Sequence, residues 1–353
     1  MAKLFYAFLT LFGVVSLVFF LFNVLPGDPA QMMLGQNENS EQIAMVKKKY
    51  GFDLPVSKQY FLYLNDLSLV SIHSKDSGDF SHYNEEKYKG RTLLQNQGYL
   101  VVLKWPHLRT SYQKRGKSVS SVISETFSNT FILALSSITI AIFMGIFLGV
   151  IATLFHKTWV DRWLQFISTL GMSVPSFFSA IIFSWFFGFV YHHYTGLNMT
   201  GSLYEIDDFG EGRTLQLKNL IMPALVLGIR PIAVIIQLMR SSLLDVLSQD
   251  YIKTAYSKGL STYSVILKHG IKNAINPVVT VISGWFASLL AGAVFVEYIF
   301  GWKGMGKEIV NALNTLDIPV IIGIVLTLSS LFILINLAVD FIYAQLDPKV
   351  KLL

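Results

Sequence analysis

A glycine-rich heptapeptide is the segment of this sequence whose spacing comes nearest to a known chemical site. Residues 301–307 read GWKGMGK, which satisfies the spacing of a P-loop, where backbone amides cradle a phosphate. The next residue is Glu308, where a P-loop needs a Ser or Thr hydroxyl to hold magnesium, and no strand pattern precedes the segment. We therefore expect no nucleotide site in this chain.

Other residues that could do chemistry lack the partners that catalysis requires. The adjacent pair His192 and His193 has no cysteine and no defined third ligand, and such a pair more often marks a loop end than a metal site. The apolar segments contain no HExxH, no GxSxG and no close pair of carboxylates. Since the chain has no cysteine, disulfides and thiolate metal sites are excluded. We expect no enzymatic activity, no metal site and no cofactor in this chain.

Three ionisable residues, Arg230, Glu297 and Asp340, lie within or at the ends of long apolar segments. A charge in hydrocarbon costs roughly 2.5–3.5 kcal/mol on insertion scales, so these side chains should face protein or water. Each is either a packing contact or part of a polar pathway. Arg230 is the best pathway candidate, because a guanidinium can bind a carboxylate through two hydrogen bonds.

The composition indicates the kind of protein that must position these residues. The chain has 353 residues, of which 53% are hydrophobic and 14% charged, and its mean hydropathy is +0.51. These values are too apolar for an ordinary soluble domain and predict a polytopic membrane protein. The net charge is +6, but no basic tail or aromatic-interleaved basic stripe accompanies it. Lysines in short membrane loops explain this charge without a nucleic-acid partner.

Six apolar runs are long enough to cross ~30 Å of hydrocarbon as helices. The first is an uncharged run of 22 residues, which exceeds the apolar core of a signal peptide and lacks a small-residue cleavage site. Together they predict an all-α polytopic fold with six transmembrane helices, at Leu4–Leu25, Asn129–Phe155, Leu164–Val190, Leu220–Met239, Ala274–Ile299 and Ile318–Ala344.

The polar stretch after the first span divides the chain into three parts, residues 1–25, 26–127 and 128–353. In the middle part, Gln31 to Leu67 predicts short helices, one of which opens at Ser40 and closes at Gly51, before Pro55. Ser68 to Lys117 is rich in Ser, Lys, Asp, Tyr and Gly. We interpret it as an inserted loop or a small extramembranous subdomain.

A polar, lysine-rich segment from Arg240 to Pro277 separates two of the later spans. Its pattern predicts two short amphipathic helices with a sharp bend between them. Ser248 can cap the first, Asp250 suits its positive end, and Lys258 with Gly259 can end it. The second should begin at Ser261 or Thr262 and present an apolar face of Tyr263, Ile266, Leu267 and Ile271. Such a pair either lies on membrane lipid or docks on a soluble partner.

The basic residues of the short loops predict the orientation of the chain. If the N-terminus is inside, the inside segments hold ten Lys and Arg residues and the short outside loops hold four. The segment from Pro26 to Phe127 carries thirteen more, but long loops translocate largely regardless of charge. Both termini and the segment 240–273 should therefore be cytoplasmic.

The heptapeptide from Lys253 to Gly259, KTAYSKG, resembles the cytoplasmic loop motif of importer-type ABC transporter permeases. That motif reads Glu-Ala-Ala, three residues, then Gly, and Lys253, Thr254, Ala255 and Gly259 fall on these positions, with the first two substituted. The proline downstream in the motif is replaced by Lys272, and the nearest proline is Pro277. These departures are similar to those of the peptide-transporting branch of the family.

Six further segments resemble recurring segments of the dipeptide and oligopeptide (nickel) permease family, first-permease type. They are residues 25–29, 172–177, 221–224, 239–246, 292–300 with 304–306, and 336–340 with 343–344 and 346–349. The region from about Ser68 to Lys117 departs from the resemblance, since typical members are shorter there.

The resemblance implies the permease subunit of a type I ABC importer for di- or oligopeptides, in the bacterial cytoplasmic (inner) membrane. It implies as partners a second permease subunit, two ATP-binding subunits that bind the ATP, an extracytoplasmic peptide-binding protein and membrane lipid. It also implies that a cytoplasmic coupling loop contacts the ATP-binding subunits, through Asp250, Lys253, Thr254, Ala255, Lys258 and Gly259.

Three alternatives remain open at this point. A nickel or other small-solute importer of the same family would share the motifs. A secondary transporter predicts paired charges at mid-membrane and inverted repeats with interrupted helices, whereas this sequence shows isolated charges and no evident repeat. A scaffold or channel subunit would not explain the loop motif.

Overall fold

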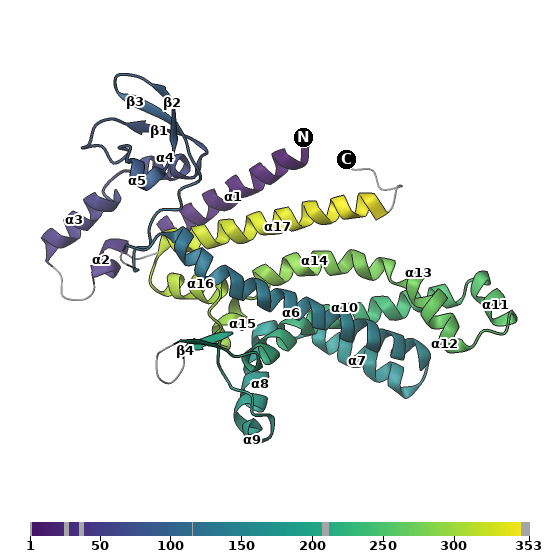
Figure 1. Ribbon diagram of the computed structural model, residues 1–353. Helices are drawn as coiled ribbons and strands as arrows, with labels where there is room; N and C mark the ends of the chain where they lie inside the picture. Colours follow the sequence, from purple (N-terminus) through teal and green to yellow (C-terminus); the bar gives the residue numbers. More distant parts are fainter. Residues whose placement is uncertain (1, 25–27, 35–38, 115, 207–211, 347–353) are drawn as a thin grey trace. The chain divides into compact units, whose positions relative to one another are not determined.

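The computed structural model describes residues 2–24, 28–34, 39–114, 116–206 and 212–346, which form a mainly helical structure (Figure 1). The chain divides into two compact units. Unit 1 comprises Met1–Glu125 and Ile309–Thr327, and unit 2 comprises Thr126–Glu308 and Leu328–Leu353.

Four helices are long and apolar enough to cross a membrane, and the number rises to six if two bent pairs each count as one span. The four are α1 (Ala2–Val24), α6 (Val119–Leu154), α10 (Lys218–Leu247) and α17 (Ile318–Leu346). The upper count equals the number of predicted spans, but its second bent pair begins at Thr262, within the segment that we predicted to be cytoplasmic. Two of the predicted spans are not the continuous helices that we predicted.

The predicted span from Leu164 to Val190 is broken by a bend of 109°. α7 (Trp159–Ser173) ends there, and α8 (Ser176–Trp185) continues into a π-helical turn, η1 (Phe186–Val190). Val174 lies between them with φ −80° and ψ 129°. A residue before proline is disfavoured in the helical conformation, so Pro175 explains the break.

The predicted span from Ala274 to Ile299 also consists of separate helices. α14 (Asn276–Gly292) is followed by α15 (Val294–Ile299). α14 is bent by 48° from the helical segment Thr262–Ala274 that precedes it. α16 (Met305–Asn314) then leads toward α17.

Unit 1 contains the short helices that the sequence predicts after the first span. These are α2 (Pro29–Leu34), α3 (Ser40–Tyr50), α4 (Val56–Leu67) and α5 (Glu85–Tyr88). α3 begins at Ser40 and ends at Gly51, whose φ of +72° is the left-handed conformation that glycine adopts without steric cost. An apolar cluster of Val15, Phe19, Tyr63 and Ile322 joins α1 and α4 to the start of α17.

The expectation of an all-α fold is incomplete, because the region from Ser68 to Lys117 contains a small antiparallel sheet. Its strands are β1 (Val70–Ser74), β2 (Arg91–Gln95) and β3 (Tyr99–Leu103), in the order β1-β3-β2. Unit 2 adds a two-stranded sheet of β4 (Tyr204–Ile206) and β5 (Arg213–Leu215).

β1 buries its polar side chains and exposes its apolar ones. Ser71 and His73 are buried, whereas Val70 and Ile72 are exposed. The buried face belongs to a polar centre around Asp66, which is 4% exposed. Asp66 accepts from Arg109 Nε at 2.7 Å and from the Tyr88 hydroxyl at 3.0 Å.

In unit 2, glycines let α6 approach α10 closely. A Cβ added at Gly145 would lie 2.6 Å from Ile235 Cβ, and one at Gly149 would lie 2.7 Å from Met239 Cβ. Neither helix could remain in place with a larger residue at these positions. These close contacts hold α10 in place as far as Met239, just before the polar segment that begins at Arg240.

Candidate functional site

α11 (Asp250–Ser257) is a short helix that follows the end of α10. Ser248 does not cap it, contrary to our prediction. The Ser248 hydroxyl donates to the Asp245 carbonyl at 2.7 Å and so closes α10, while the N-cap residue of α11 is Gln249. Only two residues separate α10 from α11, and the Ser248 hydroxyl hydrogen-bonds to the last turn of α10 instead of the first turn of α11. Asp250 lies in the first turn of α11, as predicted.

The bend that follows α11 lies where the sequence predicts it. Lys258 is the C-cap residue, and Gly259 has a φ of +81°. Ser261 then caps α12 (Thr262–Val265), because its side chain accepts from the Ser264 amide. α12 continues as a π-helical segment, η2 (Ile266–Ile271), and as α13 (Lys272–Ala274).

A small apolar cluster holds α11 against its own chain. Ile252 and Ala255 are buried with Val265 of α12, and Val246 and Leu247 from the end of α10 pack against them. Ala255 is only 7% exposed. The structure therefore places Ala255 inside the chain, where it sets the position of α11 and is not available to contact a partner.

The apolar face predicted for the second helix is half wrong, since Ile271 is half-buried and two of the other three residues are exposed. Ile266 is buried, but Tyr263 is 75% and Leu267 44% exposed. Val265, which we did not single out, is fully buried. The helical segment lies against α10 at Gly270, where an added Cβ would lie 2.9 Å from Leu243 Cδ1, and Val265 packs in the cluster that α11 forms with the end of α10. The wider π-helical turns shift the facing residues away from the pattern of a regular helix.

The remaining residues of α11 form an exposed polar face, which we call the α11 surface. Figure 1 shows α11 at the extremity of unit 2, beyond the end of α10. Lys253 Nζ lies 2.8 Å from Asp250 Oδ1, in an ion pair whose side chains are 70% and 94% exposed. The other exposed members are Tyr251, Thr254, Tyr256, Ser257 and Lys258. Five of the six predicted coupling residues, all except Ala255, are thus exposed at this end.

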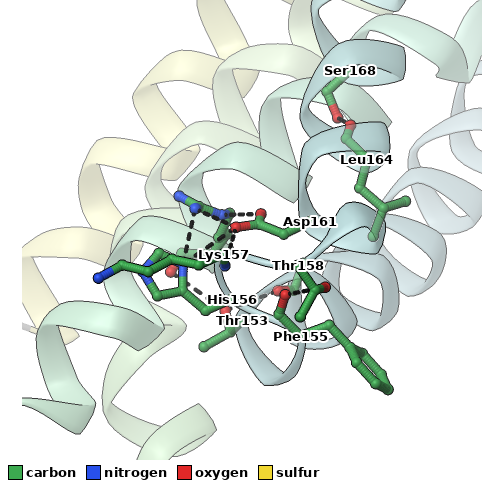
Figure 2. Close-up of polar contacts among 10 residues, drawn as sticks. Thr153, Phe155, His156, Lys157, Thr158, Asp161, Leu164 and Ser168 are labelled. Carbon is green, nitrogen blue, oxygen red and sulfur yellow. Dashed lines mark hydrogen bonds and ion pairs between the residues drawn. The ribbon is translucent and has the colours of Figure 1, made fainter.

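A charged cluster braces the end of α10 on which α11 rests (Figure 2). Arg240 donates to Asp161 from Nε at 2.6 Å and from Nη2 at 2.7 Å. His156 Nδ1 lies 3.2 Å from Asp161 Oδ2, and the Lys157 amide donates to the same oxygen at 3.1 Å. Lys157 adopts a φ of +65°. The cluster ties the turn between α6 and α7 to α10.

The sequence analysis did not identify this cluster. Arg240 and Asp161 are 79 positions apart in the chain, so no local pattern connects them. A bidentate contact between a guanidinium and a carboxylate adds a fixed geometry to the attraction between the charges. The cluster therefore holds the direction of α10, and with it the position at which α11 begins.

The P-loop-like heptapeptide does bind an acidic group through its amides, but that group is the Glu297 side chain of the same chain. The amides of Gly306 and Lys307 donate to Glu297 Oε2 at 2.7 and 3.2 Å. A Cβ at Gly304 would lie 2.4 Å from this oxygen, and one at Gly306 would lie 2.5 Å from Val294 Cα. Glu297 is fully buried. The glycines therefore make room for Glu297, which holds the turn before α16 against α15.

Of the other two candidate pathway residues, only the side chain of Arg230 is among those described. Arg230 is exposed on α10. The side chain of Asp340 lies outside the described residues, as do residues 25–27 and 347–349 of the resembling segments. The His192 ring nitrogen Nδ1 lies 2.6 Å from the Leu197 carbonyl, a loop-end contact. Among the described residues, no group of three His, Asp or Glu side chains could hold a metal ion.

Comparisons with known proteins give matches that extend over nearly the whole chain. Residues 141–352 match the family described as "Binding-protein-dependent transport system inner membrane component", and residues 1–81 match its N-terminal companion family. The dipeptide transport system permease protein DppB of Alkalihalophilus pseudofirmus is 31% identical over 97% of this chain and 95% of its own length. The glutathione transport system permease protein GsiC of Escherichia coli is 32% identical, with the same coverage.

Among solved structures, the inward-facing methionine ABC transporter MetNI is similar, with a TM-score of 0.50 and 13% identity. The match covers 64% of this chain and 96% of that one. At this identity the likeness shows the fold, which is that of a type I ABC importer permease.

Proposed function

This chain belongs to the family of binding-protein-dependent transport system inner membrane components, and from that premise we propose that it imports di- or oligopeptides. As a permease subunit of an ATP-driven importer, it forms half of the translocation path, and a second permease subunit forms the other half. The dipeptide and glutathione permeases that it matches over nearly their full length support a peptide substrate. Their names do not favour the nickel alternative.

The energy for transport comes from two ATP-binding subunits, so this chain binds no ATP, has no other cofactor and is not an enzyme. The occupation of the Gly306 and Lys307 amides by Glu297 supports this division of roles. An extracytoplasmic peptide-binding protein delivers the substrate. The excess of basic residues in the short inside loops supports cytoplasmic termini, a cytoplasmic segment 240–273 and an extracytoplasmic segment 26–127.

We infer that the α11 surface docks on an ATP-binding subunit. The observation that carries this proposal is the separation of the two faces of α11. Ile252 and Ala255 are buried in the chain's own apolar cluster, whereas Asp250, Lys253 and Thr254 are exposed. A helix that lay on lipid would present its apolar residues outward. The aliphatic residues of α11 are buried, and its outward face combines charges with the rings of Tyr251 and Tyr256, which suits contact with a protein.

Two features allow this contact to transmit motion: the bend at Gly259, which we call the hinge, and the Arg240–Asp161 ion pair, which we call the brace. Gly259 sets the angle between α11 and α12. The Arg240–Asp161 pair ties α10 to the turn between α6 and α7. A displacement of α11 by its partner is therefore passed to α10 and α6, which pack closely at Gly145 and Gly149.

The proposal is tested by reversing one charge of the α11 surface. Lys253→Glu places a second carboxylate beside Asp250 and should weaken the docking, so ATP-binding subunits should co-purify less and uptake of labelled dipeptide should fall. Arg213→Glu, an exposed residue of β5 in the same unit, is the matched control and should leave both measurements unchanged. Normal uptake and co-purification of the Lys253→Glu variant would refute the docking role.

A further inference from the structure

Unit 1 contains a cavity lined by cationic side chains, and the proposed coupling mechanism does not use it. It has a volume of about 720 Å³, within the range of small-molecule sites. Four cationic side chains line it, and none of its described lining residues is acidic. We call it the cationic cavity, and its cations are Lys49, Lys87, Lys89 and Arg109.

The nearest buried carboxylate is already occupied. Asp66 accepts from Arg109 Nε at 2.7 Å and from Tyr88 at 3.0 Å, and Lys104 donates to the Asp66 carbonyl. One carboxylate therefore serves a cluster that also includes Lys87, whose Nζ donates to the Tyr88 hydroxyl at 2.8 Å. Among the described residues that line the cavity, positive charge therefore exceeds negative charge.

Two buried nitrogen atoms behind the cavity wall have no hydrogen-bond partner. They are Arg109 Nη2 and His107 Nε2, on residues that line the cavity. Burial lowers the pKa of His107 to about 4 and also lowers the pKa of Lys87, so burial disfavours the protonated form of both groups. An unsatisfied buried donor and excess positive charge are both relieved by an anion.

The backbone is held in an unusual conformation at the same place. Among the described residues, four that are not glycine have positive φ, and two of them, Lys89 at +43° and Arg109 at +64°, line this cavity. Such conformations cluster at ligand sites because the surroundings must hold them. The positive φ values of Lys89 and Arg109 are therefore a second observation, separate from the charge, that indicates a ligand site.

The walls between the cations are aromatic. Trp105 is 83% exposed at the cavity, and Tyr50 and Tyr88 also line it. An inorganic anion would gain nothing from these rings, whereas an organic anion with an apolar or aromatic body would pack against them. The exposed residues Lys87 and Lys89 can donate to the two acceptor atoms of a carboxylate, while Arg109, which Asp66 holds through Nε, adds positive charge at the cavity.

We propose that the cationic cavity binds an organic carboxylate with an aromatic or apolar body, of the kind found at the C-terminus of a short peptide. Lys87, Lys89 and Arg109 provide the charge, and Trp105 packs against the body of the ligand. The site lies within unit 1 alone and requires neither ATP nor a partner subunit.

The proposal is tested by equilibrium dialysis of the purified full-length chain with two probes that differ only in charge. N-acetyl-phenylalanine carries the carboxylate, and its amide does not. The carboxylate should bind saturably and at least about tenfold more tightly, since a charge-assisted hydrogen bond is worth more than a neutral one. Lys87→Gln combined with Lys89→Gln should remove most of this preference.

The matched control is the double variant Lys48→Gln and Lys58→Gln, which loses the same charge in unit 1 outside the cavity. It should bind the probe like the unaltered chain. Trp105→Ala should weaken the carboxylate probe while its affinity for acetate stays the same.

Equal binding of acid and amide, no saturable binding, or an equal loss in both double variants would overturn the proposal. Competition by inorganic phosphate as strong as that by the organic acid would overturn the assignment to a carboxylate. Because the measurement involves no transport, ATP or membrane sidedness, its failure would leave the importer proposal untouched, and a failure of that proposal would leave this site intact.

Discussion

The Asp66 centre in unit 1 and the α11 surface in unit 2 use charged residues in opposite ways. Asp66 is 4% exposed and receives hydrogen bonds from Arg109 and Tyr88 of its own chain. The ion pair of Asp250 and Lys253 is mostly exposed, and only the apolar side of α11 is buried. Charges satisfied within the chain hold a fold together, whereas charges left at the end of an anchored helix remain available to a partner.

The same substitution in both regions gives the largest expected contrast. Asp66→Ala leaves Arg109 buried without its partner and should cost about 3–5 kcal/mol, so unit 1 should lose its folded structure. Asp250→Ala removes half of an exposed pair and should change stability by at most about 1 kcal/mol. Thermal unfolding of the two purified variants measures the difference, and equal destabilisation would remove the distinction between the regions.

The hinge at Gly259 should show a loss of function with little loss of fold. Gly259→Val forces a β-branched residue to a φ of +81°, a strain of roughly 1–2 kcal/mol or more. We expect uptake of labelled dipeptide to be lost, while detergent-solubilised protein is still recovered in normal amount. Gly259→Asn is the control, because asparagine tolerates positive φ, and it should retain most of the uptake. Equal uptake by both variants would show that the hinge angle is unimportant.

The buried polar centre should also respond to pH. Burial lowers the pKa of His107 to about 4 from its ordinary value of 6.5, so the folded state favours the neutral ring. Protonation then favours the unfolded chain, and the free energy of unfolding should fall as the pH drops from about 6.5 to about 4, with no further contribution from His107 below that. His107→Gln should flatten this decline in chemical denaturation series. An unchanged slope would place the pH dependence elsewhere.

Features that depend on neighbouring residues could be predicted from the sequence. Gly51 and Gly259 both end helices in the left-handed conformation, and Ser261 caps the next helix. Each of these outcomes follows from residue type and position within one turn. The helix break before Pro175 could also have been predicted, since proline restricts the conformation of the residue before it. The apolar run around Pro175 favoured a continuous span instead.

Features that depend on distant contacts could not be predicted. The strand β1 buries Ser71 and His73 because they face the Asp66 centre, so its pattern of burial is inverted relative to hydrophobicity. Ala255 faces Val265 of the following helix and not a partner, and only that tertiary contact fixes its direction. The Arg240–Asp161 brace likewise joins residues that no local pattern relates.

The most direct test of the account compares two adjacent positions of α11 in the assembled transporter. Because the chain has no cysteine of its own, Thr254→Cys and Ala255→Cys can each be labelled with a photoactivatable maleimide after purification of this chain and before its assembly with the ATP-binding subunits. The exposed position 254 should cross-link to an ATP-binding subunit, whereas the buried position 255 should label poorly and give no cross-link. Absence of any cross-link from position 254 in a complex that transports peptide would contradict the docking of α11.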